Sequence, residues 1–301
     1  MLFVATLISS PAASALDGTA LAQTRATLPD ASAHQWLDSG IAVDIPFEAT
    51  DAIDPRALAN IVRAALGARP VDVVVQPALH RRKKLLLADM DSTMIGQECI
   101  DELADYVGKK PQVAAITERA MRGEIAFAPA LRERVALLAG LPAAVIDEVI
   151  ARRITLTAGG RTLVATMRKN GAHTCLVSGG FIQFTQKIAA MIGFDEDRAN
   201  TLLVGADGKL AGRVAEPILG REAKLATLMD LRGTFGLARA DTLVVGDGAN
   251  DLAMIEDAGL GVAYHAKPKV AAAAAARIDH GDLTALLYAQ GYKRNEFVES
   301  V

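Results

Sequence analysis

The chain has 301 residues, of which 51% are apolar and 4% aromatic, and its formal net charge is -3. With domains of about 150 residues, this length predicts two domains that bury real cores. The nearly balanced charge argues against a nucleic-acid partner. The two cysteines, Cys99 and Cys175, exclude a disulfide scaffold and a cysteine zinc site and indicate a reducing, cytoplasmic compartment. No apolar run approaches the roughly 18 residues of a membrane span, so no membrane partner is expected.

Residues 1–80 are predicted to form a small α+β unit with the order βαββαβ, a ferredoxin-like sandwich without a catalytic constellation. The apolar run Leu2–Ile8 is interpreted as a strand and not as a signal peptide, because no Lys or Arg precedes or interrupts it. The further expected elements are a helix around Thr19–Leu28, extended segments Gln35–Leu37 and Ile41–Ile45, a helix from Asp54-Pro55 to Leu66-Gly67, and strand Val71–Val75. The basic run Arg81–Lys84 is expected to be a solvated linker or strand entrance.

Residues 81–301 are predicted to form a doubly wound, Rossmann-like α/β domain. Three continuous apolar runs end in a polar residue, as strands of a parallel sheet buried on both faces do: Lys84–Asp89, His173–Ser178 and Asp241–Asp247. Helical stretches separate them, among them Phe181–Met191 and Glu222–Leu231, and Thr201–Val204 with Leu210–Val214 is expected to be a hairpin. The helix-rich segment of about residues 100–157 lies between the first two of these strands and is predicted to be a cap.

Ligands of open α/β sheets bind beyond the carboxyl ends of the strands, and polar residues gather at those ends here. Asp89 and Asp91 follow the first strand in DMDST, where residues two apart share a face. The second strand ends in Ser178-Gly179-Gly180 before a helix, a combination that suits an anion. Asp247 lies in GDGAND after the last strand, and Lys224 lies in a helix before it. Each feature alone is common in turns and caps, but the four in this order indicate a phosphate site.

These motifs, DMDST, VSGG, Lys224 and GDGAND, resemble the four motifs of haloacid dehalogenase-superfamily phosphatases. GQECIDELA with Glu98, MRGEIAF and LRERVALL make about residues 83–290 similar to the phosphoserine phosphatases of that superfamily. The N-terminal unit is similar to their degenerate ACT-like domain. One departure is the segment Phe127-Ala-Pro-Ala130, where the family more often has a serine before Leu131.

The resemblance implies a Mg²⁺-dependent phosphomonoester hydrolase. The carboxylates of Asp89 and Asp247 are hard oxygen ligands that suit Mg²⁺, and the family pattern adds the main-chain carbonyl of Asp91. It further implies that Asp89 is the nucleophile, forming an aspartyl phosphate, and that Asp91 is the general acid and base. The expected phosphate ligands are Ser178, Gly179, Lys224 and Asn250, with Gly180 and Asp251 in support.

The implied small-molecule substrate is phosphoserine, whose amine Glu98 would bind and whose carboxylate Arg134 would bind as a two-bond fork. Met121 and Phe127 would form an apolar wall. By their patterns alone, Glu98 is better explained as a helix-start acid and Arg134 as a solvent-facing residue, and only the resemblance favours the binding roles. Two other functions stay open: a phosphatase or phosphotransferase for another small phosphomonoester such as phosphohomoserine, and an amino-acid sensor acting through residues 1–80. The sequence leaves a homodimer open.

Overall fold

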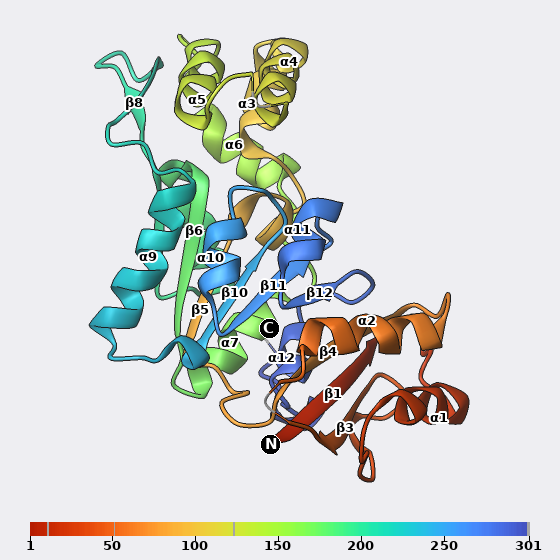
Figure 1. Cartoon of the computed structure of the whole chain (residues 1–301). Helices are drawn as coiled ribbons and strands as arrows, with labels where there is room; N and C mark the ends of the chain where they lie inside the picture. Colours follow the sequence, from red (N-terminus) through yellow and green to blue (C-terminus); the bar gives the residue numbers. More distant parts are fainter. Residues whose placement is uncertain (11, 51, 123, 300–301) are drawn as a thin grey trace.

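The computed structural model describes residues 1–10, 12–50, 52–122 and 124–299, with the backbone alone for Met121. Within these ranges an antiparallel sheet and a parallel sheet, each with helices packed against it, form two separate units, named the first and the second layer (Figure 1). The predicted order βαββαβ at the N-terminus is confirmed: β1 (Leu2–Ser9), α1 (Gly18–Thr27), β2 (Gln35–Asp38), β3 (Ala42–Glu48), α2 (Pro55–Leu66) and β4 (Val71–Pro77). The four strands pair antiparallel in the order β2-β3-β1-β4.

Local signals explain the two helices of this layer. The Asp17 carboxylate accepts the Ala20 amide at the start of α1, and the Asp54 carboxylate accepts the Arg56 and Ala57 amides at the start of α2. In α2, Leu58, Val62 and Leu66 recur on one side of the helix and are buried against the sheet.

The parallel sheet forms the center of the second layer, in the order β12-β11-β10-β5-β6-β7. Its strands are β5 (Leu85–Ala88), β6 (His173–Phe181), β7 (Glu196–Asn200), β10 (Thr242–Gly246), β11 (Leu260–Tyr264) and β12 (Ala276–Ile278). Leu85 and Leu87 join the core on one face, whereas Leu86 and Ala88 join the core on the other. Burial on both faces explains the continuous apolar runs, and the predicted α/β fold is confirmed.

Helices cover both faces of this sheet, as Figure 1 shows. They are α7 (Gly160–Lys169), α8 (Ile182–Ile192), α9 (Arg221–Thr234), α10 (Leu252–Asp257), α11 (Pro268–Ala273) and α12 (Ala285–Ala289), with short turns η2 (Arg239–Asp241) and η3 (Arg294–Glu296). Leu228 and Leu231 of α9 pack with Leu85 and Leu87, and α7 and α8 lie against the opposite face. No helix in the described ranges is long and apolar enough to cross a membrane.

In the described part of residues 100–157, the predicted cap contains helices α3 to α6, which lie above the carboxyl end of the sheet (Figure 1). They are α3 (Cys99–Tyr106), α4 (Lys110–Met121), α5 (Phe127–Ala136) and α6 (Val145–Arg153). The hairpin β8 (Leu202–Val204) and β9 (Leu210–Val214) pairs with the cap: the Gly140 amide donates to the Leu210 carbonyl over 2.9 Å, and the Leu210 amide donates to the Leu141 carbonyl over 2.8 Å.

The expectation that Arg81–Lys84 is a solvated linker or strand entrance is confirmed for Arg82 and Lys84, which are exposed just before β5, but it is wrong for Arg81 and Lys83. Arg81 is largely buried and forms a bidentate ion pair with Asp44, at 2.7 and 3.0 Å. Lys83 is buried too, and its ammonium donates to the Ala240 carbonyl over 2.8 Å. The run therefore connects the two layers through buried polar contacts, which its charge pattern alone does not reveal.

Candidate active site

Asp89 stands at the carboxyl end of β5, where the chain leaves the sheet through a tight turn, η1 (Met90–Met94). Ser92 in this turn has a φ of 55°, in the left-handed region, which bends the chain back toward the sheet. The Asp89 carboxylate accepts the Met90 amide over 2.8 Å and is 5% exposed. The nucleophile that the sequence predicts is therefore fixed in a buried position at the edge of the sheet.

The Lys224 ammonium lies between two carboxylates, 2.6 Å from Asp89 Oδ1 and 2.7 Å from Asp251 Oδ1. Lys224 belongs to the first turn of α9 and is completely buried. Burial alone would lower the pKa of its ammonium, but the carboxylates of Asp251 and Asp89 raise that pKa above its ordinary value. Burial and the charge of Asp251 raise the pKa of Asp89, while Lys224 opposes this shift.

Three carboxylates converge beside this lysine: oxygens of Asp89, Asp247 and Asp251 lie within 4.8 Å of one another. Burial and the Asp251 charge raise the pKa of Asp247 to about 6, so the cluster carries mutual repulsion that a cation would relieve. A group of hard oxygen donors fits Mg²⁺. Thr93 donates from its hydroxyl to Asp247 Oδ1 over 3.2 Å and holds the carboxylate in place. The sequence prediction placed Asp251 in support only, whereas the structure brings it into this cluster.

Asp91 lies two residues beyond Asp89 and faces the end of the neighbouring strand. Its Oδ1 accepts the Cys99 amide over 2.9 Å, and its Oδ2 accepts the Ser178 hydroxyl over 3.3 Å. Burial, reinforced by the negative charge of Glu98, raises the pKa of Asp91 to about 6. A carboxyl group with this pKa exchanges a proton far more readily near neutral pH than an ordinary aspartate does.

The Ser178–Gly180 segment bulges out of β6. Val177 pairs with Arg198 of β7, and the next pair joins Phe181 to Asn200, so the segment advances four residues on β6 against two on β7. The Ser178 hydroxyl accepts the Gly180 amide over 2.9 Å. The Asn200 amide donates to the carbonyls of Gly179 and Leu219, over 2.9 and 3.0 Å, which joins the bulge to the segment before α9. The bulge thus presents a hydroxyl and backbone amides beside Asp91, as an anion site requires.

Of the four predicted substrate-binding residues, Phe127 most clearly closes over this bulge. A Cβ atom at Gly179 would stand 3.2 Å from the Phe127 ring, and a Cβ at Gly220 would also stand 3.2 Å from it. The cap therefore touches both the bulge and the residue before α9, and any side chain at either glycine would crowd the ring. The side chain of Met121 lies outside the described part of the structure.

Glu98 and Arg134 reach the same region from the cap. The Ser92 hydroxyl donates to Glu98 Oε1 over 2.8 Å. Arg134 is partly buried and donates to the Ala130 carbonyl over 3.3 Å and to the Thr117 hydroxyl over 3.4 Å. Burial lowers the pKa of its guanidinium, and the carboxylates of Asp101, Glu98 and Asp91 oppose this shift. Arg134 is therefore shielded from open solvent and lies near the carboxylates of Asp101, Glu98 and Asp91.

Asn250 is half-buried in the loop that also carries Asp247 and Asp251. The loop turns so tightly that a Cβ atom at Gly248 would collide with Asn250 Oδ1. A Cβ at Gly246 would stand 2.5 Å from Asp251 Oδ2, so the two glycines let the polar side chains fold back over the strand end.

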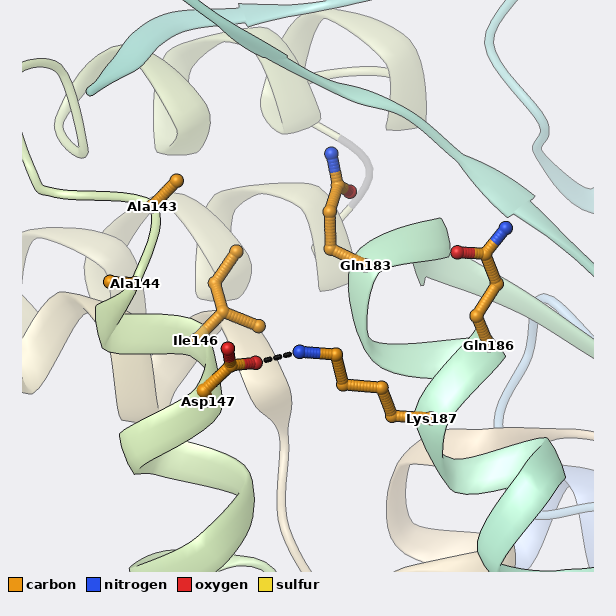
Figure 2. A pocket seen from close by; sticks show the side chains of 7 residues that line it. All are labelled: Ala143, Ala144, Ile146, Asp147, Gln183, Gln186 and Lys187. Carbon is orange, nitrogen blue, oxygen red and sulfur yellow. Dashed lines mark ion pairs between the residues drawn. The ribbon is translucent and has the colours of Figure 1, made fainter. Parts of the chain in front are cut away.

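A hollow of about 330 Å³ lies between α6 and α8, at the boundary of cap and sheet (Figure 2). The residues that line it are Ala143, Ala144, Ile146, Asp147, Gln183, Gln186 and Lys187. Asp147 and Lys187 form an ion pair across it. Its lining includes none of the predicted site residues, so the hollow is distinct from the carboxylate site.

Sequence reasoning missed three contributors to this site. Thr93, Asn200 and the Cys99 amide act by holding other groups, through contacts that only the folded chain creates. Thr93 stands within the DMDST motif and Cys99 within GQECIDELA, whereas no motif signals Asn200.

A buried aspartate and lysine at the carboxyl end of a parallel sheet, beneath a helical cap, define a capped α/β hydrolase suited to phosphoryl transfer. The sequence profile of the haloacid dehalogenase-like hydrolases matches residues 86–256, and the chain belongs to this family.

The chain is 44% identical to the phosphoserine phosphatase of Streptomyces coelicolor over 77% of its own length and 56% of that protein's length. It is 46% identical to the phosphoserine phosphatase of Polaromonas sp., over 68% of this chain and 88% of that one. A haloacid dehalogenase family hydrolase from Salmonella enterica serovar Typhi has a similar structure, with a TM-score of 0.83, 29% identity and coverage of 98% of this chain and 99% of that chain. The match spans little more than half of the Streptomyces protein.

Proposed function

We propose that the protein is a phosphoserine phosphatase, which hydrolyses O-phospho-L-serine to L-serine and phosphate. The observation that carries the proposal is the buried Lys224 bound to Asp89, next to an Asp91 that is bonded to Ser178. Relatives named phosphoserine phosphatase at 44% and 46% identity support the substrate. Glu98 and Arg134 add one negative and one positive group for the amine and the carboxylate of the substrate.

The phosphoryl group would bind in the Ser178–Gly180 bulge, with Lys224 balancing the charge of its oxygens. An Asp89 oxygen attacks phosphorus, and the bond from phosphorus to the serine oxygen breaks. Asp91 gives its proton to that leaving oxygen, which a pKa of about 6 permits near neutral pH. The products of this step are serine and an aspartyl phosphate at Asp89.

In the second step a water molecule attacks the phosphorus of the aspartyl phosphate. Asp91, now ionised, takes the proton of that water, and the bond from phosphorus to the Asp89 oxygen breaks. Inorganic phosphate leaves and both aspartates return to their starting states. Phe127 covers the bulge during both steps, which keeps other water away from the acyl phosphate.

The proposal includes Mg²⁺, held by Asp89 and Asp247, with the main-chain carbonyl of Asp91 as a further ligand. When bound, the ion neutralises charge that develops on the phosphoryl oxygens. The convergence of three carboxylates supports this assignment. Asp251 remains the partner of Lys224, and the side chain of Asn250 would form a hydrogen bond with the phosphate.

The proposal also divides the chain into an ACT-like domain of residues 1–80 and a catalytic domain of residues 81–301. It places the protein in the cytoplasm, where the free, buried thiols of Cys99 and Cys175 would persist.

A phosphate-release assay over a panel of small phosphomonoesters, with and without Mg²⁺, tests the proposal. Phosphoserine should have the highest kcat/KM, and chelation should abolish activity. A higher kcat/KM for phosphohomoserine would reassign the substrate but leave the chemistry in place.

A further inference from the structure

Asp72 of β4, a buried residue of the N-terminal sheet, contacts the second layer through several hydrogen bonds. Its Oδ1 accepts the Asp279 amide over 2.7 Å, and its Oδ2 accepts the Gly281 amide over 2.7 Å. The His280 amide donates to both oxygens, over 3.2 and 3.3 Å. One carboxylate thus fixes three successive amides of the segment 279–284, which joins β12 to α12.

The other end of this segment lies against residues 157–160, named the cap hinge, where the chain returns from the cap to α7. The Leu283 amide donates to the Ala158 carbonyl over 3.1 Å. Gly159 has a φ of 79°, and a Cβ atom there would stand 2.6 Å from the Thr284 amide nitrogen. The hinge therefore packs on segment 279–284 without room for a side chain.

The cap hinge and the residues just before it contact the end of η1, which contains Asp91 and is named the catalytic turn. The Thr157 amide donates to the Met94 carbonyl over 3.0 Å, and the Gly96 amide donates to the Thr155 carbonyl over 3.0 Å. Ile95 and Leu156 pair between these bonds. Met94 ends the η1 turn that begins directly after Asp89 and contains Asp91. Backbone hydrogen bonds and close packing therefore run without interruption from Asp72 to the turn that carries the proposed general acid.

We propose that Asp72 of the N-terminal domain is a positioning residue for the active site of the other domain. By fixing segment 279–284, Asp72 sets the position of the cap hinge at residues 157–160 and, through Met94, the position of the catalytic turn. The inference rests on the proposed function only where it concerns turnover of phosphoserine. It makes the N-terminal domain a component of the active enzyme and not an independent attachment.

The variant that tests this is Asp72→Asn, which keeps the volume of the side chain but replaces one acceptor oxygen by a donor facing backbone amides. Asp44→Asn is the matched control. Asp44 is another buried carboxylate of the same domain, pairs with Arg81, and makes none of the described contacts with segment 279–284. Asp72→Asn loses hydrogen bonds from backbone amides to a buried carboxylate, and Asp44→Asn loses a buried ion pair, so both variants should lose stability.

Hydrogen exchange of the full chain, followed by mass spectrometry, is the primary measurement. We expect Asp72→Asn to speed exchange in peptides covering residues 155–162 by about tenfold or more, as local opening becomes easier. Asp44→Asn should leave these peptides unchanged. In the activity assay, Asp72→Asn should lower kcat for phosphoserine by about tenfold, the scale of a small displacement of catalytic groups, with unchanged affinity for inorganic phosphate.

Gly281→Ala is a second variant that disturbs the same contact from the other side, because a Cβ there would stand 3.1 Å from Asp72 Oδ2. It should reproduce the faster exchange at residues 155–162. Wild-type exchange at the hinge in both variants, or equal acceleration by Asp44→Asn, would overturn the proposal. So would a failure of both variants to fold, since the contact would then serve folding alone. The exchange result stands whichever phosphomonoester the enzyme prefers.

Discussion

The Lys224 ammonium lies 2.6 Å from the Asp89 carboxylate, and the side chains of both residues are buried. The same ammonium binds Asp251 at 2.7 Å, so one cation connects the end of β5, the start of α9 and the loop after β10. An anionic nucleophile cannot approach a phosphoryl group unless positive charge offsets their repulsion. This arrangement supplies that charge where the sequence predicts the nucleophile.

Asp89→Asn should lower kcat for phosphoserine by at least about a thousandfold, because an amide neither attacks phosphorus nor replaces an anionic metal ligand. Circular dichroism and thermal unfolding should show an intact fold, since Asp251 still pairs with Lys224. Turnover close to that of the wild type would remove covalent catalysis through Asp89 from consideration.

Asp91→Asn should affect substrates according to their leaving groups. Serine is a poor leaving group that needs a proton, whereas the oxygen of an aryl phosphate needs little protonation. We expect kcat for phosphoserine to fall by about 100-fold or more and kcat for p-nitrophenyl phosphate to fall much less. Equal losses on the two substrates would show that Asp91 is not the acid.

Arg134→Ala tests the substrate assignment. Loss of a charge-assisted bidentate pair in a partly dry site should cost about 2–4 kcal/mol, or roughly 30- to 1000-fold in kcat/KM for phosphoserine. Phosphoethanolamine lacks the carboxylate and should be affected little. Arg134→Lys should recover only part of the loss, because an ammonium cannot reproduce the planar fork. A similar loss with both substrates would make Arg134 a structural residue of the cap.

Much of the fold could be predicted because its signals are local. The apolar runs at Leu85–Ala88 and Thr242–Gly246 are buried on both faces of the sheet, and the residues at their ends must then meet at one edge. For the same reason Asp89 and Asp247 could be assigned to one site without any contact being known, whereas Lys224, which lies in a helix, was assigned from the order of the four motifs.

Other features were not predictable because they depend on distant contacts. β7 has the polar sequence EDRAN and lies at the edge of the sheet, so no apolar run indicates it, and β11 and β12 were also missed. Asn200 at the end of β7 contributes to the site because β6 bulges beside it and the Asn200 side chain donates to the Gly179 carbonyl in the bulge. The charge pattern predicts that Arg81 and Lys83 are solvated. They are buried instead, because Arg81 pairs with Asp44 and Lys83 donates to the Ala240 carbonyl.

The burial of Lys83 predicts a pH dependence of stability. Burial lowers the pKa of its ammonium from 10.5 to about 8. Between these values the unfolded chain binds the extra proton, so the contribution of Lys83 to the free energy of unfolding should rise with pH. Relative to Lys83→Met, the wild type should gain up to about 3 kcal/mol between pH 8 and 10.5, measured by denaturant unfolding. Lys84→Met is the control, because it removes the neighbouring lysine, whose side chain is 61% exposed.

Mass spectrometry of the enzyme quenched in acid during turnover of phosphoserine with Mg²⁺ tests the central claim most directly. Borohydride reduction of the quenched protein marks an acyl phosphate and identifies the residue that carried it. The account predicts a phosphoryl group on Asp89, formed with phosphoserine and absent in Asp89→Asn. A phosphoryl group on Asp91 or Ser178, or rapid turnover with no phosphorylated residue at any time, would contradict it.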